Sequence, residues 1–249
     1  MFTRNDPNQR FKNRFIWFRK WILERQTFKT LSRDSGLSID TLQRIFYTFL
    51  ERSPAVKILK RSNIHLRLDA TYFEQFCMLC YQDHDDGYTQ LIRFSNGEHF
   101  GEIKEDLDNL IKLGVHIESI TTDGHKSILK AIKKSLPDVI VQRCDRIYWT
   151  KELEQWYGRH KNYLQEKSYN EKTGRYWYTH KLLRRSYFTI KRALPNMFHY
   201  LSNPKIPHTT NGIEGFFSHL KNHLDLHRGL TLEHRINFVK WYVYLSNDK

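Results

Sequence analysis

The chain has 249 residues, a net charge of +14 and a mean hydropathy of −0.68. This length allows one large domain, or a small domain beside a medium one. No apolar run approaches the roughly 18 residues of a membrane-spanning helix, and the cysteines, three in number, offer no disulfide framework. These numbers argue against a membrane-spanning protein and a disulfide-stabilised secreted domain, so we expect a reducing cytoplasm.

Charge is unevenly distributed along the chain. Residues 1–60 carry a net charge of +8, residues 61–144 carry −3 and residues 145–249 carry +9. Two basic arms around an acidic middle are typical of a protein that holds a polyanion by its arms and brings one phosphate over metal-neutralised carboxylates. The alternative is a generally basic protein without such a partner.

The first part of the chain predicts helices. Aromatic and basic residues at helical spacing predict a helix over residues 11–25, with a cationic outer side. A helix over residues 28–35, a turn at Gly36 and a second helix capped by Ser38 have the punctuation of a helix-turn-helix. Side chains that could reach base edges and phosphates in a major groove lie at the start of the second helix: Ser38, Asp40, Thr41, Gln43 and Arg44. A small helical bundle without DNA binding is the alternative.

Strands and helices follow Ser53-Pro54. Apolar patterns predict strands over residues 64–71, 72–81, 88–94, 117–122 and 139–143, and helices over residues 100–113 and 125–136. Three antiparallel strands followed by alternating helices and strands predict an α/β fold with a mixed sheet flanked by helices. In the helix over residues 100–113, four apolar side chains are expected to face the core: Ile103, Leu107, Leu110 and Ile111.

Two features of the predicted sheet allow a metal site as well as a structural role. Cys77 and Cys80 lie three apart in a predicted strand, so their thiols should point to opposite faces, which favours structural cysteines over a redox or zinc pair. The acid-rich run over residues 82–87 ends in Asp-Gly, which is typical of a solvated hairpin turn. A metal site in this loop is the alternative.

Three further acids carry the main functional prediction. Asp69 and Asp123 each fall where a buried strand should end, and Glu214 lies in the first turn of a later helix. Such acids can converge on divalent metal, because Mg²⁺ takes oxygen ligands and a pair of ions assists phosphodiester chemistry. The alternative for Glu214 is a helix cap, because Asn211 and Glu214 have capping-box spacing.

These residues lie in segments that resemble a known family. LDATYF, ITTDGHKSILKAI and VIVQRC, followed by TTNGIEGFFSHLK with HRGL, resemble the DDE transposases of bacterial insertion sequences, in the Mutator-like group. The resemblance runs from about Phe18 to the C-terminus, and the Asn-x-x-Glu block with its trailing His-Arg-Gly is its most specific part. It implies that Asp69, Asp123 and Glu214 hold Mg²⁺ or Mn²⁺, as two ions, and catalyse DNA strand cleavage and strand transfer.

The residue patterns and the resemblance together predict an architecture, and the resemblance implies partners. A helix-turn-helix region over residues 1–54 would precede a ribonuclease-H-like catalytic domain over residues 55–249. An all-helical, aromatic and basic insertion is expected at about residues 145–205. The implied partners are double-stranded DNA, as the element's terminal inverted repeats and its target, and a second copy of the chain in a synaptic dimer or larger assembly. No membrane partner is expected, and the implied location is the bacterial cytoplasm, at the nucleoid.

One departure keeps other hypotheses open. The family often has Cys-x-x-His after the last strand, and Ile147 stands where the His would be. A catalytically inactive remnant that binds DNA is therefore the main alternative to an active transposase. A structure-selective nuclease without strand transfer is a third hypothesis.

The helix that carries Glu214 also carries regularly spaced histidines. His219, His223 and His227 recur every four residues, which permits zinc binding only if another segment completes the site. We expect phosphate-facing or solvated histidines instead, near the predicted DNA contacts Lys221 and Arg228. Gly229 should end this helix, and residues 232–245 predict a closing helix.

Overall fold

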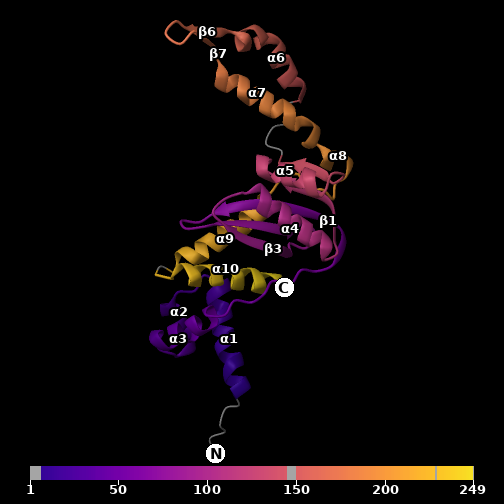
Figure 1. The fold of residues 1–249 in the computed structure, drawn as a ribbon. Coiled ribbons are helices and arrows are strands. Elements are labelled where there is room, and N and C mark those ends of the chain that lie inside the picture. The colour runs from indigo at the N-terminus through magenta and orange to yellow at the C-terminus, as the bar shows by residue number, and fades with distance from the viewer. Residues whose placement is uncertain (1–6, 145–149, 228, 249) are drawn as a thin grey trace, which may run out of the picture.

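The computed structural model describes residues 7–144, 150–227 and 229–248. A mixed five-stranded sheet in the order β3-β2-β1-β4-β5 lies at the centre of the molecule (Figure 1). β1 pairs antiparallel with β2 and parallel with β4, which runs parallel with β5. The predicted α/β class, a mixed sheet flanked by helices, is therefore confirmed. The strands span Arg61–Tyr72 (β1), Cys77–Asp83 (β2), Thr89–Ser95 (β3), Val115–Thr122 (β4) and Ile140–Arg143 (β5).

The central strand β1 is longer than the sequence pattern predicts. It runs on to Tyr72, and the chain then turns over residues 73–76, where the Phe73 N–H donates to the Phe76 carbonyl at 2.8 Å. The predicted strand over residues 72–81 is therefore wrong in its first half. Exposed Glu74 in the middle of the apolar run marks the turn that separates β1 from β2.

One face of the sheet packs against α4 (Phe100–Lys112) and α5 (Lys126–Ser135). Leu107 and Leu110 of α4 are buried there as predicted, but Ile111 is 39% exposed. The position that faces the core in its place is Asp106, whose carboxylate accepts hydrogen bonds from the Tyr81 hydroxyl at 2.9 Å and from Arg93 Nε at 2.8 Å. A carboxylate with these partners can occupy an interior position that the apolar pattern would assign to a hydrophobic residue.

The other face packs against helices from both ends of the chain. These helices are α1 (Pro7–Leu23), α2 (Phe28–Ser35), α3 (Ile39–Leu50), α9 (Asn211–Asp225) and α10 (Leu232–Asn247). One hydrophobic core joins Trp21 of α1, Phe46 of α3, Met78 of β2, Phe217 of α9 and Phe238 of α10. This core is continuous across residue 54, where the sequence predicts a domain boundary, and that boundary stays a prediction.

The connection between α2 and α3 has the predicted local structure. Thr27 caps α2 by accepting from the Thr30 N–H, and Gly36 ends it in the left-handed region at φ +70°. Ser38 caps α3 by accepting from the Thr41 N–H at 3.2 Å. A glycine that ends one helix in the left-handed region, followed by a serine that caps the next, is a local pattern that predicts two helices joined by a short turn.

The segment between β5 and α9 is not all-helical, so that prediction is wrong. Two helices, α6 (Thr150–Gln165) and α7 (Lys181–Ala193), flank an antiparallel hairpin of β6 (Lys167–Asn170) and β7 (Arg175–Tyr178). The aromatic residues of β6 and β7 favour strands, and the turn between them ends at Gly174 with φ +62°. The hairpin lies at the end of the molecule opposite α1 (Figure 1). Two short elements, η1 (Leu194–Asn196) and α8 (His199–Ser202), return the chain to the sheet.

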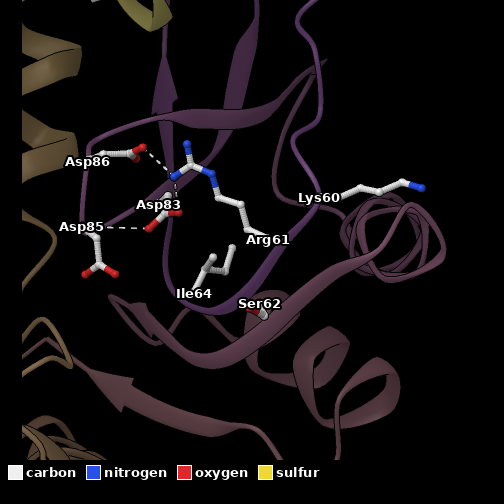
Figure 2. Close-up of a pocket in the computed structure, with 7 residues that line it drawn as sticks. All are labelled: Lys60, Arg61, Ser62, Ile64, Asp83, Asp85 and Asp86. Atoms are coloured by element: carbon white, nitrogen blue, oxygen red, sulfur yellow. Dashed lines mark hydrogen bonds and ion pairs between the residues drawn. The ribbon is translucent and has the colours of Figure 1, made fainter.

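The acid-rich loop after β2 is a turn, but one of its acids is buried. Arg61 donates to Asp83 at 3.0 Å and also to Asp86, while Lys60 points away from both (Figure 2). Asp83 is only 1% exposed and also accepts from the Asp85 N–H at 3.1 Å. The loop therefore differs from the fully solvated turn that we expected, and Arg61 occupies the place that a cation would take between Asp83 and Asp86.

The cysteines are free, and none of the described helices is long and apolar enough to cross a membrane. Burial raises the pKa of Cys77 to about 11 and that of Cys80 to about 12. Thiols with pKa values this high stay protonated near neutral pH, which supports the structural interpretation.

Removing the buried carboxylate of α4 should cost stability. We expect Asp106→Ala to lower the free energy of unfolding by about 2–3 kcal/mol, because it leaves Arg93 and the Tyr81 hydroxyl without their shared acceptor. The matched control is Asp108→Ala on the same helix, which breaks an i, i+4 pair with Lys104 near the surface and should cost about 0.5 kcal/mol or less. Urea unfolding measures both, and equal losses would contradict the role assigned to Asp106.

Candidate active site

Two of the predicted acids lie at one edge of the sheet. The parallel register of β1 and β4 pairs Leu66 with Ile120 and Arg67 with Thr121. Continued by two residues, this register brings Asp69 opposite Asp123, which directly follows β4; β1 itself runs three residues beyond Asp69, to Tyr72, so the predicted strand end at Asp69 is wrong although the two acids lie side by side. Ligand sites commonly occur at this edge of parallel strands in α/β proteins.

The turn after β4 holds Asp123 in a defined position. One of its carboxylate oxygens accepts from the His125 N–H at 2.8 Å, at the start of α5. Gly124 between them has φ +87°, in the left-handed region that favours glycine. Asp123 itself is exposed, so its carboxylate is available to a ligand.

Glu214 reaches the same edge from the first turn of α9. Its carboxylate accepts from the Thr210 hydroxyl at 3.1 Å, and that hydroxyl lies 3.3 Å from the Cys144 sulfur at the end of β5. The helix begins at Asn211, with Thr210 as its N-cap residue, so Asn211 does not stand in the cap position of a capping box. Asn211 and Glu214 therefore do not form the capping box that their spacing suggested.

The electrostatics of Asp69 indicate that the three acids lie close together. Burial raises its pKa, the Ala70 N–H lowers it, and the negative charges of Asp123, Glu214 and Glu98 raise it; together these effects bring the pKa to about 7. The Ala70 N–H donates to the Asp69 carboxylate at 2.8 Å. A cation placed among these carboxylates would relieve their repulsion and favour the ionised form of Asp69.

Two hollows lie beside these acids. One of about 550 Å³ is lined by Asp69 and Glu214 and continues along α9 past Lys221 to Asp225. A second of about 330 Å³ is lined by Asp123, and Thr210 forms part of its wall. Because the Thr210 hydroxyl donates to Glu214, a hydrogen bond joins the walls of the two hollows.

The donor set fits a hard divalent cation, although no single ion could be held by all the acids at once. Among the described residues, no three His, Cys, Asp or Glu side chains are grouped closely enough to hold one metal ion together. Mg²⁺ does not require such a group, because it is commonly bound by one or two carboxylates together with water and substrate phosphate. Asp69, Asp123 and Glu214 could hold ions in this way.

The predicted DNA contacts divide into two places. Lys221 lies in the larger hollow, with its ammonium 5.6 Å from the centre of the Phe73 ring. Ser38 and Thr41 are engaged in capping α3, Gln43 is partly buried and Arg44 is exposed. None of these four residues lines either hollow. Arg228 lies outside the described residues, as does Ile147.

Two of the regularly spaced histidines are structural, which corrects our expectation of phosphate-facing or solvated rings. His223 is 4% exposed and its Nδ1 lies 3.0 Å from the Ile22 carbonyl, whereas His219 is exposed. His227 lies beyond the end of α9, and its Nδ1 accepts from Trp21 Nε1 at 3.1 Å. His223 joins α1 to α9 from the helix face that meets the core, and His227 joins α1 to the residues just after α9.

Sequence reasoning missed Thr210 and Arg143 at this site. Thr210 directly precedes the Asn-x-x-Glu block, and a hydroxyl four residues before the acid could have suggested its contact with Glu214. Arg143 ends β5 and lines the smaller hollow beside Asp123. Its position at a strand end, like that of Asp123, was the available signal. The chain matches no protein-family model and no curated protein.

The stability of the fold should depend on pH through His227. Burial lowers the pKa of His227 to about 4, below its ordinary value of 6.5, so its contribution to stability is complete above pH 6.5 and is lost as the pH falls through 4. We expect His227→Gln to remove about 2 kcal/mol of the stability change between pH 7 and pH 4. Urea unfolding at both pH values measures this change. His219→Gln, an exposed change on the same helix, should keep the wild-type pH dependence.

Asp69 should make the stability of the fold depend on pH in the opposite direction when no divalent metal is bound. Its folded-state pKa of about 7 lies above the ordinary value of 3.8, so its contribution to stability is present below pH 3.8 and is lost as the pH rises through 7. We expect Asp69→Asn in EDTA to be more stable than the wild type at pH 8 by about 1–2 kcal/mol, allowing for partial solvent exposure, with the gap closing towards pH 4. Asp225→Asn, in the same hollow, serves as the control. A stability difference between Asp69→Asn and the wild type that stays the same at every pH would show that repulsion and burial do not act on Asp69 as described.

Proposed function

We propose that the chain is a DDE transposase, which binds the ends of a mobile DNA element and catalyses metal-dependent strand cleavage and strand transfer. The observation that carries this proposal is the meeting of Asp69, Asp123 and Glu214, from two parallel strands and a later helix, at one edge of the sheet. The resemblance of the segments that contain these acids to the Mutator-like transposases of bacterial insertion sequences supports it.

The topology also supports the finer fold assignment in this proposal. The order β3-β2-β1-β4-β5, with β1 antiparallel to β2 and parallel to β4, is the order expected of a ribonuclease-H-like core. The segment between β5 and α9 would be an insertion in that core. The left-handed Gly36 and the Ser38 cap support a helix-turn-helix formed by α2 and α3.

In the proposed mechanism the protein positions DNA and compensates charge. Asp69, Asp123 and Glu214 would hold two Mg²⁺ or Mn²⁺ ions. Bound there, the ions would activate water or a 3′-hydroxyl and stabilise the departing 3′ oxygen. Lys221, which lines the same hollow as Asp69, would bind a backbone phosphate. Arg44 on the exposed side of α3 would contact the DNA that specifies the element's ends.

The charge pattern and the expected reaction suggest the partners. Both basic arms would contact a polyanion while the acidic middle acts on one phosphate. Joining two DNA ends in concert calls for a homodimer or a larger synaptic complex, acting at the bacterial nucleoid. An inactive DNA-binding remnant is the second candidate, favoured by Ile147 in place of the family His and by the lack, among the described side chains, of three ligands around one metal position.

Cleavage of DNA from the encoding locus tests the proposal. We expect the purified chain, with Mn²⁺, to cut at the flanking inverted repeats and to join the ends to target DNA, and EDTA to abolish both. Asp69→Asn, Asp123→Asn and Glu214→Gln should each reduce cutting by about 1,000-fold while DNA binding persists, because metal-stabilised charge contributes several kcal/mol. Gel analysis of cut and joined strands measures both steps.

The control variant and the contrary outcomes separate the candidates. Asp225→Asn changes a carboxylate at the far end of the same hollow and should leave cutting unchanged. Binding without cuts, indifferent to the three substitutions, would favour the inactive remnant. Cuts in many DNAs without joined products would favour a structure-selective nuclease.

A further inference from the structure

The smaller hollow beside Asp123 has two kinds of lining. It lies between the end of β5, helix α7 and the residue before α9, and its volume is about 330 Å³. This is the lower end of the range of small-molecule pockets, and it is too small for a DNA duplex. We call it the Arg143 pocket; its lining consists of Asp123, Arg143, Cys144, Thr189, Ile190, Ala193, Met197 and Thr210.

Within the described part of the chain, one nitrogen of the charged group in this pocket lacks a hydrogen-bond partner. Arg143 Nε is buried and has no hydrogen-bond partner among the described residues. No ion pair joins the guanidinium to Asp123 or to any other described carboxylate, although both side chains line the same hollow. A buried guanidinium nitrogen without an acceptor is costly, so an added acceptor would relieve a cost that the described residues leave uncompensated.

The guanidinium has a defined position. It lies against Gly124, where a Cβ atom would overlap it, and Gly124 also has a left-handed backbone. Arg143 therefore lies over the turn that follows Asp123. The hydroxyl of Thr210 is already engaged with Glu214 and Cys144, which leaves Arg143 as the cationic donor of the pocket.

The remaining wall is apolar and belongs to a strongly basic helix. Ile190 and Ala193 of α7, together with Met197, form a surface suited to a flat ring or a sugar. α7 carries five Lys or Arg residues and no Asp or Glu. A polyanionic strand that entered the pocket would therefore pass along a cationic helix.

We propose that the Arg143 pocket receives one unpaired nucleotide of the DNA strand, with its phosphate bound by Arg143 and its base against Ile190 and Met197. This inference rests on the proposed function. A planar guanidinium matches phosphate oxygens through parallel hydrogen bonds, and the apolar wall accepts a base that has left its stack. The nucleotide would lie next to the phosphodiester that the acids act on, because Asp123 lines the pocket.

Binding of DNA with and without an unpaired end tests this inference. The probes are a fluorescein-labelled duplex with a short single-stranded flap and the same duplex without the flap, measured by anisotropy in EDTA so that no strand is cut. We expect the wild type to bind the flapped duplex about tenfold more tightly, because stacking and a charged hydrogen bond each contribute on that scale. Arg143→Met removes the cation, and Ile190→Trp fills the cavity. Each variant should lose the preference for the flapped duplex and bind the flush duplex as tightly as the wild type does.

A matched arginine controls for general electrostatics. Arg192 is exposed on the same helix α7 and does not line the pocket, so Arg192→Met should retain the preference for the flap. Thermal melting checks that each variant is folded, and Ile190→Trp keeps the test decisive if Arg143→Met does not fold. Equal binding of flapped and flush DNA by the wild type, or a full preference in folded Arg143→Met or Ile190→Trp, would overturn the inference.

The same proteins distinguish this inference from the proposed function. Metal-dependent cutting by a wild type that shows no flap preference would leave the enzyme assignment standing and remove the pocket's role. A flap preference that depends on Arg143, without any cutting, would support the nucleotide site and count against the enzyme.

Discussion

The parallel pairing of β1 with β4 determines where chemistry can occur in this chain. Neighbouring parallel strands end at the same edge of a sheet, and each of these two delivers a carboxylate there, Asp69 and Asp123. Helices cover both faces of β1, so Asp69 is partly removed from water, whereas Asp123 stands in an exposed turn. A one-residue shift of this register would turn Asp69 towards the α4 and α5 core, because successive side chains of a strand point to opposite faces.

The acids are stabilised mainly by the backbone and by helix termini. Asp69 accepts from the Ala70 N–H, and Asp123 accepts from an N–H at the start of α5. Neither makes an ion pair with a described Lys or Arg side chain. Glu214 stands in the first turn of α9, where the helix dipole favours a negative charge. The contacts of Asp69 and Asp123 fix these two carboxylates without neutralising them, so an added cation would have a large effect on their energy.

The sequence allowed good prediction wherever one local rule decided the structure. The Thr27 and Ser38 caps, the left-handed Gly36 and the strand-end position of Asp123 follow from patterns of a few residues. Prediction failed where a tertiary partner decided the outcome. Asp106 is interior because Tyr81 and Arg93 meet it, and His227 is buried because Trp21 donates to it. Neither partner is adjacent in sequence, and the β6–β7 hairpin was missed because aromatic residues satisfy helical and strand patterns alike in short runs.

A long segment separates Asp123 from Glu214, yet the geometry between them can be maintained because the returning chain is anchored to the sheet. The side-chain amide of Gln142 in β5, which is fully buried, donates to the Met197 carbonyl at 2.7 Å and accepts from the His199 N–H at 3.0 Å. Thr121 in β4 donates to the Pro207 carbonyl at 2.7 Å. The entropic cost of closing a loop rises only slowly with its length, so a long insertion is tolerated once its ends are held. These contacts precede Thr210 and direct it to the end of β5, which explains how α6, α7 and the hairpin can extend away from the sheet while Glu214 stays at its edge.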